Sequence, residues 1–127
     1  MKDISNNEII NRFRKSWIDV ENFYDTLIEN HSWNKLKPIK ELIFELKLKG
    51  ENEHFRLGTS VHYLIISRSV EHGLRSDQKH IRIMQTSLNF KVELREGLKE
   101  DRELVSENLK DVEIEQFLKI LKNTLID

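Results

Sequence analysis

The chain has 127 residues, of which 38% are hydrophobic and 34% are charged, and its formal net charge at pH 7 is −1. This length is close to the commonest domain size and suffices to bury a core without metal or cross-links, so we expect a single domain over residues 1–127. The apolar content together with the balanced charge excludes a disordered chain. The charge is also far from the strong basicity of a dedicated nucleic-acid binder.

Two absences narrow the chemistry further. The chain has no cysteine, which removes disulfides, thiol nucleophiles and cysteine-ligated metal sites. Its first ten residues lack an apolar signal core, and no apolar stretch approaches the ~20 residues that a membrane-spanning helix needs. We therefore expect a cytoplasmic protein that has no membrane partner.

A long amphipathic helix is predicted from about Asn6 to Asn30. Ser5 and Glu8 form a capping-box pattern, in which the hydroxyl accepts a free backbone N–H and the carboxylate reaches back. Large apolar residues then recur at steps of three and four, the period of a helix face that packs on a core. This stripe comprises Ile10, Phe13, Trp17, Val20, Tyr24 and Leu27.

The middle of the chain predicts strands. Pro38 cannot lie inside a helix, and from Glu41 to Lys49 apolar and charged residues alternate, which indicates a half-buried first strand. A second strand is expected from Phe55 to Val70, with a bend or bulge at Gly58.

A third strand is expected over residues 80–94. Its apolar positions change parity near Gln85, which requires a bulge or bend there because strand side chains alternate between faces. Residues 95–110 are compatible with a charged loop, a short edge strand around Leu104 or a frayed helix.

A final helix is predicted to begin at Asp111, which can cap it. Its buried face is expected to comprise Ile114, Phe117, Leu118, Leu121 and Leu125. The element order α-β-β-β-(β)-α predicts an α+β fold. In this fold an antiparallel three- to four-stranded meander is flanked by the long N-terminal helix and the C-terminal helix.

The most distinctive segment runs from His54 to Arg82 and holds four of the five histidines, with five Lys or Arg residues against two acids. It contains a candidate ligand-binding surface, the basic rim, made of Arg68, His72, Arg75, Lys79, His80 and Arg82. Guanidinium groups bind phosphate or carboxylate with two parallel hydrogen bonds. The alternative is that the rim is neutralised internally by the acidic C-terminal third, for instance by Glu100, Asp101 or Glu103.

No catalytic residue, metal site or cofactor is predicted. The histidines never lie two to four residues apart, so a shared metal would need His62 opposite His80 on neighbouring strands. Glu45 and Lys47 would share one face of a strand, as in the magnesium sites of restriction-type nucleases, but the acidic residue expected on a preceding strand is missing. The chain also lacks a nucleophile elbow and a glycine-rich phosphate loop.

The leading functional hypothesis is a small interaction module of the immunity-protein, adaptor or accessory-subunit type, with another protein as its partner. Trp33, in a polar loop, is the candidate partner-binding residue, although it could instead cap the helix–sheet junction. One alternative is a binder of an anionic ligand or nucleic acid through the basic rim. Another is a small metal-dependent hydrolase or nuclease that uses Glu45, Lys47 and a histidine.

Nucleic acid is the less favoured ligand of the rim. The predicted element order is that of the double-stranded-RNA-binding domain, whose second helix begins with a basic cluster. Here the matching helix begins with Asp111, Glu113 and Glu115, which would repel phosphate.

Overall fold

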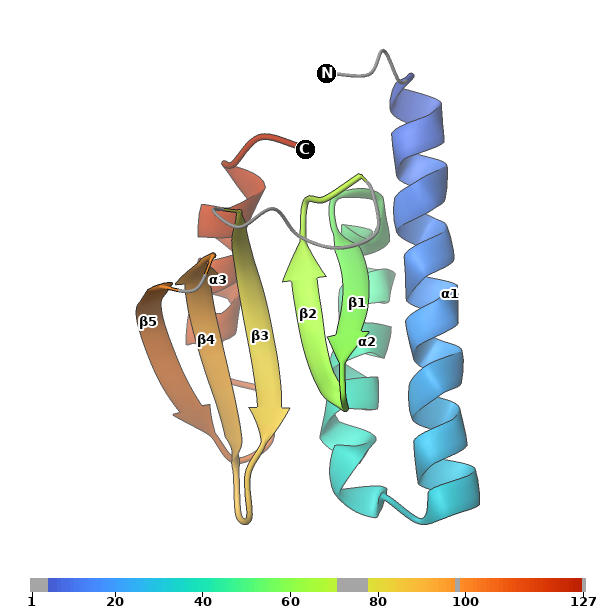
Figure 1. The fold of residues 1–127 in the computed structure, drawn as a ribbon, viewed down its shortest axis with the longest axis vertical. Coiled ribbons are helices and arrows are strands. Elements are labelled where there is room, and N and C mark those ends of the chain that lie inside the picture. The colour runs from blue at the N-terminus through green and yellow to red at the C-terminus, as the bar shows by residue number, and fades with distance from the viewer. Residues whose placement is uncertain (1–4, 71–77, 98, 127) are drawn as a thin grey trace.

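The computed structural model describes residues 5–70, 78–97 and 99–126, which form helices around one antiparallel sheet (Figure 1). The α-helices are α1 (Asn6–His31), α2 (Lys37–Leu48) and α3 (Val112–Lys122), and short 3-10 helices span Asn34–Leu36 and Glu51–Glu53. The strands lie in the sheet in chain order: β1 (Arg56–Ser60), β2 (Tyr63–Ser67), β3 (Lys79–Gln85), β4 (Phe90–Glu96) and β5 (Lys99–Ser106). The α+β class, the antiparallel meander and both flanking helices are confirmed. The sheet has five strands where three or four were expected.

The first helix forms as its sequence predicts. The Glu8 N–H donates to Ser5 Oγ at 3.2 Å, and the helix ends at Ser32, whose φ of 58° is left-handed. The buried face of α1 contains Phe13, Trp17, Val20 and Tyr24 from the predicted stripe.

The predicted strand between Glu41 and Lys49 is wrong, because this segment belongs to α2 and its C-terminal cap. Pro38 lies in the first turn, where its missing N–H leaves no intrahelical bond unmade. The segment satisfies both periods, but the side chains that enter the core are those of one helix face: Ile39, Leu42, Ile43 and Leu46. Phe44 and Leu48, which the alternation grouped with them, are exposed.

The predicted strand from Phe55 to Val70 is two strands. Ser60 pairs with Tyr63, so Val61 and His62 form a two-residue hairpin turn between β1 and β2. Neither residue is the Gly, Asn or Asp typical of such turns, which explains why the reversal was not predicted.

The predicted strand over residues 80–94 is also a hairpin, so the parity change near Gln85 marks a chain reversal rather than a bulge. At the reversal the Asn89 N–H donates to Thr86 Oγ1 at 3.0 Å. For residues 95–110 the edge-strand alternative is correct, since β5 (Lys99–Ser106) includes Leu104 and lies at the edge of the sheet.

The last helix follows the prediction over most of its length. Asp111 occupies the N-cap position, but its side chain makes no capping hydrogen bond. The four predicted core residues from Ile114 to Leu121 are buried, whereas Leu125 is exposed because the helix ends at Lys122.

The helices divide between one face and one edge of the sheet. Figure 1 shows α2 and α3 behind the strands and α1 beside β1. Three polar side chains of α1 hold this first hairpin: Ser16 Oγ accepts the Leu57 N–H at 3.0 Å, Trp17 Nε1 donates to the Phe55 carbonyl at 2.8 Å, and Tyr24 Oη donates to the His62 carbonyl at 2.9 Å. The opposite edge, β5, is exposed and rich in charge, which discourages pairing with another strand.

The turn between β1 and β2 contains a strained residue. Val61 has a φ of 57°, a left-handed conformation that costs a β-branched residue about 1–2 kcal/mol. Replacing Val61 by Asn, which tolerates this conformation, should raise the free energy of unfolding by about 1 kcal/mol in chemical denaturation. The control is Val105→Asn, the same change on an exposed residue of β5 outside the left-handed region, which should bring no gain. A Val61→Asn variant no more stable than the wild type would contradict the argument.

Candidate functional site

No helix of the described residues covers one face of the sheet, and the side chains on that face follow from the register. Leu57, Ile66, Ile81 and Leu94 lie opposite one another across four strands and point into the core. Since strand side chains alternate, the neighbours of these residues face the other way. The two rows next to them on this open face are Arg56, Ser67, His80 and Arg95, and Gly58, Ile65, Arg82, Glu93 and Glu103. A further row on this face holds Met84, Lys91 and Val105.

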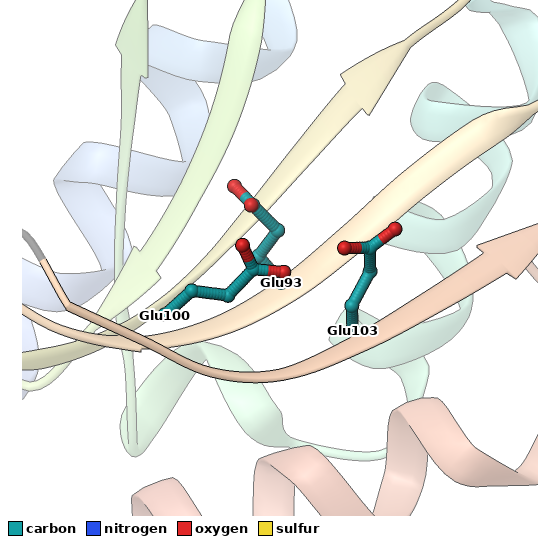
Figure 2. A group of neighbouring side chains, drawn as sticks. All are labelled: Glu93, Glu100 and Glu103. Atoms are coloured by element: carbon teal, nitrogen blue, oxygen red, sulfur yellow. The ribbon is translucent and has the colours of Figure 1, made fainter.

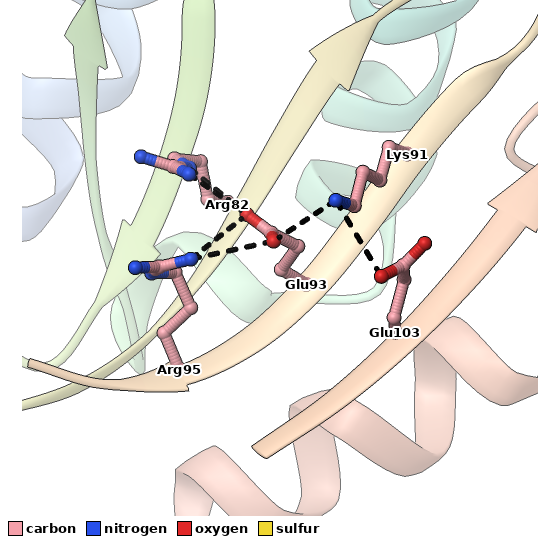
Figure 3. Close-up of polar contacts among 5 residues, drawn as sticks. All are labelled: Arg82, Lys91, Glu93, Arg95 and Glu103. Carbon is pink, nitrogen blue, oxygen red and sulfur yellow. Dashed lines mark hydrogen bonds and ion pairs between the residues drawn. The ribbon is translucent and has the colours of Figure 1, made fainter. Parts of the chain in front are cut away.

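A network of ion pairs, the charge cluster, occupies the middle of the open face (Figure 3). Arg82 donates to Glu93 Oε1 from Nε at 3.1 Å and from Nη2 at 2.9 Å, and Arg95 Nη1 lies 3.3 Å from both carboxylate oxygens. Lys91 Nζ lies 3.5 Å from Glu93 and 3.4 Å from Glu103. The side chain of Glu93 is only 2% exposed, because these cations cover it.

Glu93 is ionised despite its burial. Burial acts to raise its pKa, but the hydrogen bond from Arg82 and the charges of Arg82, Arg95 and Lys91 outweigh this and hold the pKa below its ordinary value. The cluster therefore pairs most of its charge within the sheet, with two carboxylates facing three cations.

Three carboxylates of this face lie close enough to share a cation (Figure 2). Glu93, Glu100 and Glu103 each offer an oxygen within 4.8 Å of the other two, a donor set that suits hard cations such as Mg²⁺ or Ca²⁺. Lys91 already bridges Glu93 and Glu103. A hydrogen bond to Glu103, followed by burial and the charges of Glu93 and Glu103, raises the pKa of Glu100, against the charge of Lys91.

The basic rim is not assembled among the described residues. His72 and Arg75 lie outside the described residues. Arg68 Nη1 donates to the His54 carbonyl at 3.0 Å, His80 is buried with its Nδ1 3.2 Å from the Gln78 carbonyl, and Arg82 belongs to the charge cluster. The acid that neutralises Arg82 is Glu93, not one of the three acids named from the sequence.

Lys91, Glu93 and Arg95 are the residues of this face that sequence reasoning missed. Their alternate spacing along one strand was a usable signal, because it places all three on a single face. Only the register of β4 against β3 shows that this face is shared with Arg82.

The structure does not assemble either of the two arrangements that the sequence offered for metal chemistry. His62 lies in the turn next to Tyr63, whereas His80 lies opposite Ser67 at the other end of β2, so the two imidazoles do not pair. Glu45 and Lys47 are two residues apart on α2, where such neighbours point in different directions.

Trp33 lies in a second candidate site, at the end of the molecule where three chain reversals meet. Its ring packs edge-to-face on His62 at 5.3 Å between centroids, and His62 packs in the same way on Tyr63 at 5.0 Å. A hollow of about 480 Å³ opens beside these rings, and it is lined by Ser32, Trp33, Asn34, Lys35, His62 and Gln85. Trp33 thus covers the junction of helix and sheet and remains 43% exposed.

Comparison of the chain with protein-family models, curated proteins and solved structures gave no match. No helix in the described ranges has the length and apolar character needed to cross a bilayer. The functional argument therefore depends on the geometry of the two sites alone.

The charge cluster predicts a large effect of Glu93→Gln. This change removes the negative charge that Arg82 and Arg95 share. It should lower the free energy of unfolding by about 2–3 kcal/mol at neutral pH. The loss is smaller than for a fully buried ion pair because Arg82 is about a third exposed. The lowered pKa of Glu93 means that its contribution is present above the ordinary carboxyl pKa of 4.5 and is lost as pH falls through the lowered pKa. Chemical denaturation should therefore show the gap between variant and wild type closing in acid. Glu103→Gln, at the exposed end of the cluster, is the control and should cost about 0.5 kcal/mol or less.

The burial of His80 predicts that the free energy of unfolding depends on pH near neutrality. Burial lowers its pKa, and the charges of Arg95 and Arg82 act in the same direction, against the hydrogen bond to the Gln78 carbonyl and the charge of Glu93. The unfolded chain therefore takes up a proton near the ordinary pKa of 6.5 that the folded protein does not, and stability should fall as pH drops through that value. His80→Asn, whose amide can replace Nδ1, should reduce this slope, whereas Ser67→Ala on the neighbouring strand should keep it. Equal slopes in both variants, measured by denaturation across this range, would refute the assignment.

Proposed function

We propose that the chain is a small interaction module that docks another protein through its turn end. The turn end comprises the α1–α2 connection at Ser32–Trp33, the β1–β2 turn at Val61–His62 and the β3–β4 turn at Thr86–Asn89. In Figure 1 these three reversals form the lower end of the molecule.

Large apolar side chains are exposed on all three reversals. Trp33 is 43% exposed, Val61 77% and Leu88 87%. A single exposed apolar residue needs no explanation, but three on adjoining turns beside a hollow resemble the anchors of a protein interface. Tryptophan is among the residues most enriched in binding hot spots.

The conformation of Val61 carries the proposal. A solvent-exposed residue with a left-handed backbone would be cheaper as Gly or Asn, and valine contributes no core contact there to offset the strain. Strain held at an exposed position is typical of residues kept for recognition. The side chain of Val61 is then best explained by a partner that covers it.

The turn end is suited to rigid docking. The indole of Trp33 is supported by the ring of His62, whose carbonyl is fixed by Tyr24, so little conformational freedom is lost on binding. Lys35 is the one Lys, Arg, Asp or Glu among the described residues that line the hollow. The partner that fits is a folded protein that offers an apolar pocket to Trp33 and a carboxylate to Lys35.

The proposal assumes that the protein acts in the cytoplasm, which is the location expected from the sequence. The anionic-ligand hypothesis stays a prediction, and the described part of the basic rim does not favour it, because Arg68 donates to the backbone and Arg82 is neutralised. The hydrolase hypothesis loses its basis with the helical placement of Glu45 and Lys47.

The test is capture of a partner from a lysate of the source organism with wild-type and Trp33→Ala protein as bait. Truncation of a hot-spot tryptophan should weaken binding by about 2 kcal/mol, which is roughly a thirtyfold loss of affinity. Val61→Asn should weaken binding while making the chain more stable, a combination that general unfolding cannot produce.

Leu125→Ala is the control for Trp33→Ala and should leave capture unchanged. Leu125 is an exposed apolar residue, as exposed as Leu88, but it lies beyond α3. A photo-crosslinking residue at position 88 should label the captured protein, and one at position 125 should not. Capture that is unaffected by Trp33→Ala, or labelling from position 125 alone, would refute docking at the turn end.

A further inference from the structure

A groove lies on the outer side of the helical pair α1 and α2. It encloses about 690 Å³ and is lined by Ile28, Glu29, Asn34, Lys37, Lys40, Glu41, Phe44 and Glu45. Asn34 also lines the hollow at the turn end, so the two depressions adjoin.

The floor of the groove is apolar and partly exposed, although Ile28 also packs against the core. Phe44 is 60% exposed, although it belongs to a helix whose other aromatic and aliphatic side chains are mostly in the core. Ile28 of α1 faces the same space, and Leu48, one turn beyond Phe44 on α2, extends the exposed apolar line. Two apolar positions one turn apart can receive side chains that recur with the period of a helix.

The rim of the groove is acidic once internal ion pairs are considered. Lys40 pairs with Asp25 of α1, and a hydrogen bond to Asp25 is the main reason that the pKa of Lys40 is raised. Glu29, Glu41 and Glu45 make no ion pair within 4.0 Å in the part of the chain that the structure describes, and Lys37 is the one remaining cation of the lining. The groove thus presents an excess of negative charge around an apolar floor.

We infer that this groove binds a basic amphipathic α-helix of a partner protein. Apolar side chains of such a helix, spaced at three and four residues, would contact Phe44, Ile28 and Leu48, and its Lys or Arg residues would face Glu29, Glu41 and Glu45. α2 has 12 residues and is therefore about 18 Å long, which provides a track for about three turns of a bound helix. The inference depends on the proposed function, because it names a second contact and its chemical class for a chain that docks proteins.

Three synthetic peptides of about 18 residues, or five helical turns, test this binding mode. The first places Leu on one helical face and Lys on the other, the second replaces every Lys by Glu, and the third scrambles the first so that no apolar face remains. Fluorescence anisotropy with the full chain should show binding of the first peptide, which weakens at higher salt, and at least tenfold weaker binding of the other two. Equal binding of the acidic or the scrambled peptide overturns the inference.

Variants locate the contact. Phe44→Ala should lower the affinity for the basic peptide at least tenfold, whereas Phe44→Leu should retain most of it. The double variant Glu41→Lys and Glu45→Lys should lower this affinity at least tenfold at low salt. Thermal unfolding of each variant checks that the fold is intact. Peptide binding that survives Phe44→Ala in a folded chain overturns the groove assignment.

Trp33→Ala separates this inference from the proposed function. It should leave peptide binding unchanged while it removes capture of the native partner. Loss of peptide binding in Trp33→Ala would place the helix at the turn end and overturn the groove assignment. Capture through Trp33 with no peptide binding overturns only the present inference.

Discussion

The arrangement of this molecule depends on hydrogen bonds from α1 to the backbone of the first hairpin. Ser16, Trp17 and Tyr24 each satisfy a polar backbone group of residues 55–62, and all three are buried on one helix face. A buried backbone group without a partner is costly, so these bonds fix where β1 lies and protect its edge from pairing with another strand. Since β1 defines the position of its neighbours, the bonds also determine which face of the sheet stays open and bring His62 beside Trp33.

The open face and the turn end differ in the chemistry of their exposed side chains, which is charged and paired on the first and apolar on the second. On the open face, Glu93 and Glu103 pair with Arg82, Arg95 and Lys91, which leaves little unpaired charge there for a ligand. At the turn end and in the adjoining groove the situation is reversed, because large apolar side chains stay exposed there: Trp33 is 43% exposed although its ring packs on His62, and Phe44 is 60% exposed. The surfaces suited to binding a partner therefore lie at the turn end and on the outer side of α1 and α2, and not on the charged open face of the sheet.

The parts of the fold that sequence reasoning predicted well are those where one period dominates. The stripe of α1 recurs from Ile10 to Leu27, about five helical turns, and α3 repeats it with acidic residues at its start and lysines at its end. The failures occur where a short segment satisfies two patterns at once. In α2, alternation from Leu42 to Leu48 and a helical face from Ile39 to Leu46 coexist, and the choice was made by the core that accepted Ile39 and Ile43. Both hairpins were missed because one turn uses Val61, a residue that avoids such turns, and the other was read as a bulge.

The sequence by itself determined the fold class, the terminal helices and their buried faces, because these follow from local periodicity and from the free energy of burying apolar side chains. It also marked Trp33 as a candidate contact. Only the tertiary structure decided the helical state of α2, the strand register that places Glu93 among three cations, and the meeting of Trp33, His62 and Gln85 around one hollow. These features depend on contacts between residues far apart in the chain, and local sequence patterns do not predict the energy of such contacts.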